Sequence, residues 1–187
     1  RTEVVGPKVS GELIQAGTFA IALAVFAMLL YIWFRFEWQF SLGAVLALVH
    51  DVILTIGIFC ITQLEFNLPI IAAILTIVGY SMNDTVVVYD RVRENLRKHR
   101  SLVIDQLLDL SINETLSRTI ITSITTLLAL LSLYIFGGSV IKGFTFAMMW
   151  GVLVGTYSSI FVAAPLLKYL EVKRDWTSTS AVDSTRK

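Results

Sequence analysis

Five apolar runs, each long enough to cross a lipid bilayer, constrain the fold of this chain more than any other feature of its sequence. A bilayer core about 30 Å thick requires about 20 predominantly apolar residues per helix. The runs that meet this length occupy residues 13–36, 41–63, 68–90, 118–136 and 144–168. We therefore predict an all-α fold, a polytopic bundle of about five transmembrane helices.

The composition indicates that lipid surrounds most of the chain. Of its 187 residues, 56% are hydrophobic and 16% are charged, and the mean hydropathy is +0.75. Soluble domains carry about 25% charged residues. The formal net charge of +1 is spread along the chain without a continuous basic patch. We therefore expect membrane lipid, and no nucleic acid, among the partners.

Motifs for covalent chemistry are not apparent in the sequence. The single cysteine, Cys60, lies inside an apolar run, so we interpret it as a packing residue and expect neither an internal disulfide nor a Cys/His metal site. No arrangement of nucleophile and base and no phosphate-binding glycine loop is visible. We therefore predict that the chain is not an enzyme and needs no cofactor or metal.

The basic residues are sorted by side when the five spans alternate across the membrane. One side receives Arg35, the run 91–100 and Lys168, whereas the last loop on the other side carries Lys142 alone. Cytoplasmic loops carry an excess of Lys and Arg. We therefore predict an external start and a cytoplasmic C-terminus. An external start without Met leads us to expect a further span upstream in the natural protein.

These assignments divide the chain into residues 1–12 as an external lead-in, 13–170 as the transmembrane bundle, and 171–187 as a disordered cytoplasmic tail. Within the bundle, residues 91–117 are predicted to form a cytoplasmic connector. Apolar residues recur there at helical spacing, opposite two aspartates. This pattern indicates an amphipathic helix lying along the membrane surface.

Ionisable residues inside the apolar runs are the candidate functional groups. At 1.5 Å per residue, His50 and Asp51 lie roughly 13 Å past Ser41, near the bilayer midplane. Asp84 lies about 10 Å inside the cytoplasmic boundary, too deep for its short side chain to reach water. Arg118 falls at that boundary or one turn within it. A buried Asp or Arg costs about 2.5–3.5 kcal/mol, so each needs a partner, water or a change of protonation.

Each of these residues also has a purely structural interpretation. Asp84 fits a proton-carrying site or a helix-packing hydrogen bond shared with Asn83 and Ser81. His50 fits a satisfied core histidine or, with the adjacent carboxyl, a proton relay. From the residues alone, Arg118 fits equally well a snorkelling anchor and a buried partner of Asp84.

Two further patterns are interpreted as packing or surface features. Gly151, Gly155 and Ser159 form a small-residue stripe that lets another helix approach closely. Four charged residues at the water boundary have i,i+3 and i,i+4 spacings, so we predict that they form surface ion pairs: Asp90, Arg93, Glu94 and Arg97.

The stretch Val78–Asn95, VGYSMNDTVVVYDRVREN, resembles the most distinctive segment of the SecF family of bacterial protein-export membrane proteins. This SecD/SecF family belongs to the wider RND superfamily. Further similar segments follow in the family's order over residues 4–170: Val5-Gly6-Pro7, His50-Asp51-Val52, Leu64-Glu65-Phe66-Asn67-Leu68, SINETLSRT at 111–119 and GTYSS at 155–159. A long polar signature inside an apolar span is specific, whereas the glycine stripe is common in membrane helices.

The resemblance implies that the bundle corresponds to spans two to six of SecF. It also implies a complex with SecD beside the SecYEG channel in the bacterial inner membrane. That complex would use the proton-motive force to assist export of translocating preproteins. On the matching positions, the family's proton pathway falls on Asp84 and Arg118, which favours the buried pair. Asp51 and His50 remain further candidates for that pathway on depth alone.

The mechanism expected from the resemblance alternates Asp84 between a carboxylate paired with Arg118 and a protonated form that releases it. Two other functions remain open. An RND-type proton-driven exporter of small molecules or lipids would use the same buried charges for another cargo, although the SecF-like segments argue against it. In a passive assembly subunit, neutralising these charges would lower stability without changing proton coupling.

Overall fold

The computed structural model describes residues 7–64, 67–170 and 172. Five long helices dominate it, and each is long and apolar enough to cross a membrane. The elements in chain order are α1 (Pro7–Arg35), α2 (Trp38–Thr62), α3 (Leu68–Lys98), α4 (Ile104–Phe136), α5 (Ser139–Ser158), the π-helical turn η1 (Ser159–Ala163) and α6 (Ala164–Tyr169). The described part of the chain contains no strand. The predicted all-α bundle of about five spans is therefore confirmed.

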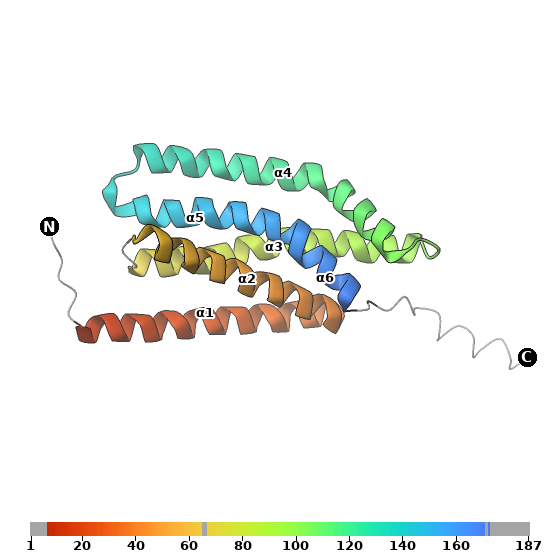
Figure 1. The fold of residues 1–187 in the computed structure, drawn as a ribbon, viewed down its shortest axis with the longest axis horizontal. Coiled ribbons are helices and arrows are strands. Elements are labelled where there is room, and N and C mark those ends of the chain that lie inside the picture. The colour runs from red at the N-terminus through yellow and green to blue at the C-terminus, as the bar shows by residue number, and fades with distance from the viewer. Residues whose placement is uncertain (1–6, 65–66, 171, 173–187) are drawn as a thin grey trace, which may run out of the picture.

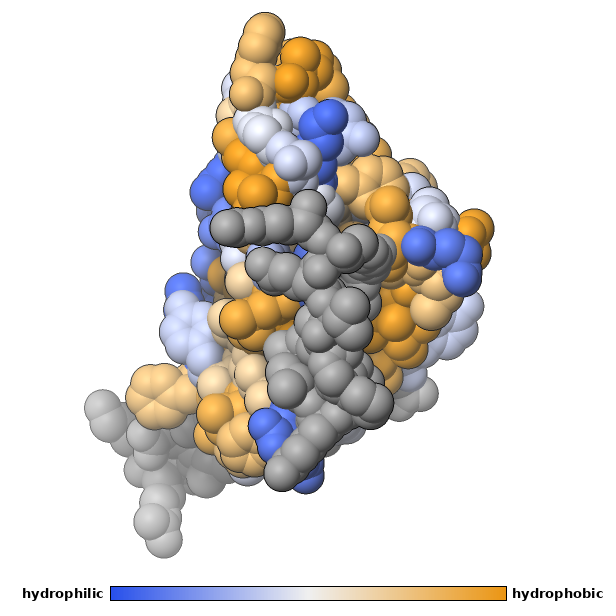
Figure 2. All heavy atoms as spheres, turned by 90° about the vertical axis from the view of Figure 1, so that its left-hand side faces the viewer, coloured by the Kyte–Doolittle hydropathy of each residue, from blue (hydrophilic) through white to orange (hydrophobic). Residues whose placement is uncertain are grey.

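The long helices run side by side, with α1 and α4 at opposite edges and α2, α3 and α5 between them (Figure 1). The start of α1 and the end of α6 lie at opposite ends of the bundle, as an odd number of crossings requires. Seen from the end where α1 begins, apolar side chains reach the surface on several sides, with hydrophilic ones between them (Figure 2).

Local sequence signals account for several helix ends. Pro69 lies in the first turn of α3, where a missing backbone N–H leaves no hydrogen bond unmade. After the end of α2, Gln63 adopts a left-handed conformation with φ 52°. Arg97 and Lys98 occupy the last turn of α3, where the negative end of the helix dipole favours basic residues.

Helix α3 forms the centre of the bundle. It contacts α1, α2, α4 and α5, and 56% of its apolar window is buried, against 11% for α1 and for α4. The two edge helices instead expose large apolar side chains such as Phe34 and Phe136. Apolar surface on this scale belongs against lipid or another protein chain, which agrees with a multi-pass membrane protein.

Two glycines of α5 let this helix approach α3 closely. A Cβ atom at Gly155 would stand 3.0 Å from Cβ of Ser81, and one at Gly151 would overlap the side chain of Ile77. Contacts this close leave no room for larger residues on α5. The prediction that the small-residue stripe serves helix packing is confirmed.

The predicted connector at 91–117 is not a separate helix, and this prediction is wrong. Helix α3 continues to Lys98 and α4 begins at Ile104, so the stretch is divided between two long helices. The apolar residues Leu107 and Leu108 are buried in the core of the bundle. The amphipathic pattern therefore reflects packing against protein, which also gives one polar and one apolar face.

Two smaller predictions also differ from the structure. Cys60 is exposed on the surface of α2, so it packs no core within the described part of the chain. The lead-in predicted at 1–12 is helical from Pro7 onward. The tail predicted at 171–187 lies outside the described residues except for Val172, which packs into the core. The external and cytoplasmic sides assigned to these segments stay predictions.

Candidate functional site

Asp51 on α2 lies at the contact between three helices, and its side chain is completely buried. The hydroxyl of Ser81 on α3 donates a hydrogen bond to Oδ2 of Asp51. The Nδ1 atom of His50 lies 3.0 Å from Oδ1 of the same carboxyl, and it donates there in the tautomer that carries a proton on Nδ1. Ser158 of α5 is also buried and lies beside this group. Both carboxyl oxygens therefore have a hydrogen-bond partner.

The Asp51 site exists because the helices approach closely around it. Gly155 allows α5 to reach the backbone and side chain of Ser81. The Ser158 hydroxyl donates to the carbonyl of Ala47 at 3.4 Å, which connects α5 to α2. Buried hydrogen bonds are strong and directional because no water competes for them, so this cluster fixes α2, α3 and α5 relative to one another.

Asp84 lies about one turn further along α3 than Ser81, and its environment is different. Its side chain is buried, and the residue is 5% exposed. Within the described part of the chain, Oδ2 of Asp84 accepts no hydrogen bond. A buried carboxylate without donors is costly, because neither water nor protein replaces its hydration. This group therefore needs a proton, a bound water or an approaching cation.

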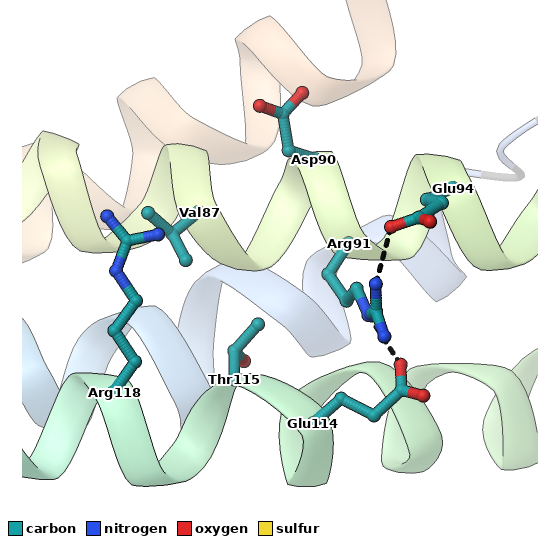
Figure 3. A pocket seen from close by; sticks show the side chains of 7 residues that line it. All are labelled: Val87, Asp90, Arg91, Glu94, Glu114, Thr115 and Arg118. Atoms are coloured by element: carbon teal, nitrogen blue, oxygen red, sulfur yellow. Dashed lines mark hydrogen bonds and ion pairs between the residues drawn. The ribbon is translucent and has the colours of Figure 1, made fainter.

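Arg118 on α4 is the cation whose field reaches Asp84. Its side chain is exposed and extends from α4 toward α3, where the guanidinium lies beside Val87 (Figure 3). The described residues form no ion pair between Arg118 and Asp84. The structure thus brings the two residues onto facing helices but does not form the buried pair that the resemblance favours.

An open pocket of about 520 Å³ leads to Arg118 from the end of the bundle. It lies between α3 and α4 and is lined by Val87, Asp90, Arg91, Glu94, Glu114, Thr115 and Arg118 (Figure 3). Most of these side chains are charged or polar. The pocket therefore offers water a route along α4 toward the region of α3 that carries Asp84.

A charged network crosses from α3 to α4 along this pocket. Arg91 binds Glu114 through Nε at 2.6 Å and Glu94 through Nη1 at 2.5 Å. The amide nitrogen of Asn95 donates to Glu114 at 2.7 Å and to the Ser111 hydroxyl at 3.0 Å. These contacts hold the ends of α3 and α4 together beyond the apolar part of the bundle.

Asp90 and Glu94 form ion pairs, but with partners other than those predicted. Glu94 pairs with Arg91 and Lys98 on its own helix. Asp90 instead pairs with Arg35 of α1 at 3.4 Å. Helical spacing identified charged neighbours along α3, but it carries no information about a side chain on another helix.

The structure separates the four predicted site residues into two groups. His50 and Asp51 form one hydrogen-bonded site with Ser81, and Asp84 and Arg118 face each other without direct contact. The predicted burial of Asp51 and Asp84 is confirmed. Sequence reasoning placed Ser81 beside Asp84 and missed its bond to Asp51. It also missed Ser158, although the GTYSS segment was a visible polar signal.

Comparisons with known proteins agree with this architecture. The family model described as "Protein export membrane protein SecD/SecF, C-terminal" matches residues 1–173. The protein translocase subunit SecF of Rhodobacter capsulatus is 56% identical over 173 residues, which are 92% of this chain and 52% of the relative. The corresponding subunit of Rickettsia bellii is 55% identical over 174 residues, 93% of this chain and 57% of the relative. The chain thus spans about half the length of these curated relatives.

Two solved structures have the same fold. The crystal structure of SecDF from Thermus thermophilus, described as a translocon-associated membrane protein, superposes with a TM-score of 0.84 at 47% identity. The match covers 89% of this chain and 23% of that one. SecDF in its super-membrane-facing form gives a TM-score of 0.77 at 45% identity, over 89% and 22% of the two chains. The chain therefore belongs to the C-terminal SecD/SecF family of protein-export membrane proteins.

Proposed function

We propose that this chain is the membrane-embedded, proton-responsive part of a SecF-type subunit. It acts with a SecD partner beside the SecYEG channel, where the proton-motive force assists the export of preproteins. The family and the names of its relatives support the class of machine. The observation that carries the assignment of a proton-responsive site is Asp84, a buried carboxyl with no hydrogen-bond donor at Oδ2.

A carboxyl in this position responds to protons because its two charge states need different surroundings. The protonated form is neutral and is accommodated by the apolar contacts of α3 as they stand. The carboxylate requires a cation, and Arg118 on the facing helix is the one whose field already reaches it. Loss of the proton therefore draws α4 and α3 together through this pair, and its return releases them.

The energy of proton entry is sufficient to bias such a pair of states. One elementary charge that crosses 100 mV releases about 2.3 kcal/mol. A two-state equilibrium shifts about tenfold for each 1.4 kcal/mol of differential free energy. The polar pocket between α3 and α4 supports water access to Arg118 from one end. Movement of these helices is the output that reaches the rest of the complex.

The test uses the full-length protein in complex with its SecD partner, reconstituted in vesicles with a proton gradient. We expect Asp84→Asn to abolish proton-dependent export and proton conduction, because the amide neither carries the proton nor attracts Arg118. Arg118→Gln should also lose both activities, because the Asp84 carboxylate would then have no cation to attract. Preprotein export and the internal pH of the vesicles are measured together.

The matched control is Asp109→Asn, which removes an exposed carboxylate from α4, the helix that carries Arg118. It should retain both activities. The proposal would be wrong if Asp84→Asn, at normal levels of assembled complex, still conducted protons and exported preprotein at the unmodified rate. The alternative of a small-molecule exporter predicts proton conduction that depends on Asp84 but no effect of its substitution on preprotein export.

A further inference from the structure

Glu114 of α4 is the shared acceptor of two side chains that lie one turn apart on α3. Its Oε2 atom lies 2.6 Å from Nε of Arg91 and accepts a hydrogen bond from the amide of Asn95 at 2.7 Å. The same amide donates to the Ser111 hydroxyl at 3.0 Å, and both Asn95 and Ser111 are buried. We call Arg91, Asn95, Ser111 and Glu114 the Glu114 clamp. Because these contacts span about one turn of each helix, they oppose sliding of α4 along α3.

The Glu114 clamp sets the level at which Arg118 meets α3. Arg118 follows Glu114 by one turn on α4. On the antiparallel helix α3, Val87 precedes Arg91 by one turn, so the guanidinium of Arg118 lies beside Val87 (Figure 3). Asp84 lies three residues further back on α3, an axial distance of about 4.5 Å. Within the described part of the chain, Arg118 and Asp84 form no ion pair.

A slide of α4 by less than one turn would bring Arg118 level with Asp84. A slide of about 4.5 Å would also carry Glu114 well beyond hydrogen-bond distance of Arg91 and Asn95. The closed Glu114 clamp and the pairing of Arg118 with Asp84 are therefore alternative registers of the same two helices.

We infer that Glu114, Arg91 and Asn95 are positioning residues for the proton site, because their contacts hold α3 and α4 in the register that keeps Arg118 apart from Asp84. This inference rests on the function proposed above, in which the Asp84 carboxylate attracts Arg118. The closed clamp opposes that pairing and so favours the protonated carboxyl. An open clamp favours the ion pair and release of the proton. By linkage, ionisation of Asp84 in turn favours opening of the clamp.

The charges around Asp84 leave Arg118 as its partner. Within the described part of the chain, Arg118 is the residue whose charge acts on Asp84. Titratable groups on the other helices packed against α3 and α4 have contacts elsewhere: Arg35 with Asp90, His50 with Asp51, Lys142 with Tyr134, Tyr157 with Phe161, and Lys168 with Asp105. A change at the Glu114 clamp can therefore reach Asp84 through Arg118 or through the screened field of the exposed Glu114 charge itself.

The test follows the protonation of Asp84 by its carboxyl infrared band, assigned by its absence in Asp84→Asn, as the pH of the full-length complex is varied. Glu114→Gln keeps the size of the side chain but removes its charge. It should shift the titration of Asp84 to lower pH by about one unit, a roughly ten-fold change in proton concentration. Asn95→Ala removes a donor without changing any charge and should shift the titration in the same direction by about half a unit. The matched control, Asp109→Asn, removes an exposed carboxylate of α4 outside the clamp and should leave the titration unchanged.

The same substitutions in an Arg118→Gln background separate the clamp from a direct effect of charge. Both shifts should disappear there, because no cation is left to pair with Asp84. A Glu114→Gln shift that persisted in Arg118→Gln would overturn the inference, since the Glu114 charge would then act on Asp84 directly. Unshifted titrations in both Glu114→Gln and Asn95→Ala would also overturn it, because Arg118 would then reach Asp84 by rotation of its side chain alone. These titrations do not measure export, so failure of this inference is distinguished from failure of the proposed function, which Asp84→Asn tests.

Discussion

Asp51 and Asp84 are two buried carboxyl groups on neighbouring helices, yet the protein surrounds them in opposite ways. Asp51 accepts hydrogen bonds from Ser81 and His50, and its position is fixed by the contact of three helices. Asp84, about one turn beyond Ser81, has a buried oxygen that accepts no hydrogen bond within the described part of the chain. Burial alone therefore does not distinguish the two residues, whereas the supply of donors does.

The hydrogen bonds of Asp51 hold the bundle together, whereas the surroundings of Asp84 do not fix its protonation state. A buried carboxyl with all its hydrogen bonds in place stabilises one arrangement of helices and resists change. A buried carboxyl without donors stabilises whichever arrangement brings it a proton or a cation. We therefore propose that α3 carries a fixed point at Ser81 and a responsive point at Asp84.

The largest expected contrast is in stability. Asp51→Leu should destabilise the full-length protein by about 3 kcal/mol, because the buried Ser81 hydroxyl and the half-buried His50 ring lose their partner in the centre of the bundle. Asp84→Leu should change stability by no more than about 1 kcal/mol, since no hydrogen bond is lost. Equilibrium unfolding in mixed detergent micelles measures both variants. Equal losses of stability would show that the two carboxyl groups do not differ in structural role.

A steric substitution tests whether close helix packing maintains the Asp51 site. Gly155→Val should cost about 2 kcal/mol, because the new side chain would meet Ser81 at 3.0 Å and push α5 from α3. Gly57 has open space around its Cα, so Gly57→Ala should be neutral or slightly stabilising in the same unfolding experiment. A neutral Gly155→Val would mean that α5 is free to shift.

Removing a single donor to Asp51 should have a smaller effect. Ser81→Ala should cost about 1 kcal/mol, the typical net value of one hydrogen bond, while His50 remains as the other donor. The matched control is Ser132→Ala, whose hydroxyl bonds only the carbonyl of Leu128 within α4 and is exposed. The control should lie within the error of the unfolding measurement. A Ser81 variant as stable as the control would remove the basis for calling Asp51 fixed.

The smallest expected effect on stability is that of Arg118→Gln. The side chain is exposed and forms no ion pair with Asp84 in the described structure. The free energy of unfolding should therefore change by less than about 0.5 kcal/mol. This variant combines unchanged stability with the loss of activity expected above. A large loss of stability would indicate instead that the pair is closed in the resting protein.

Hydropathy was sufficient to predict the five spans, and depth along each span was sufficient to predict the burial of Asp51 and Asp84. The predicted third span stops at 90, because the apolar run ends there, but α3 continues to Lys98. Contacts with α4 at Arg91 and Asn95 support that extension. Hydropathy detects where lipid ends and carries no signal for a helix that continues beyond it.

Side-chain contacts between different helices could not be predicted from the sequence. Ser81 follows Asp51 by thirty positions, and their hydrogen bond depends on the rotation of α2 and α3 about their axes. Depth places both residues near one level but leaves that rotation open. The family resemblance favoured the pairing of Asp84 with Arg118, yet the exposed position of Arg118 depends on how α4 packs at the edge of the bundle.

The π-helical turn at Ser159–Ala163 has a consequence for the register of the last helix. A π turn holds one residue more than an α turn, and Pro165, which follows it, has no N–H to donate to the preceding turn. Within this turn, the carbonyl oxygen of Ala163 accepts a hydrogen bond from the hydroxyl of Tyr89 on α3. Deleting one residue here would rotate α6 by about 100° and separate Lys168 from Asp105. The turn thus acts as a one-residue insertion that sets which face of α6 meets the start of α4.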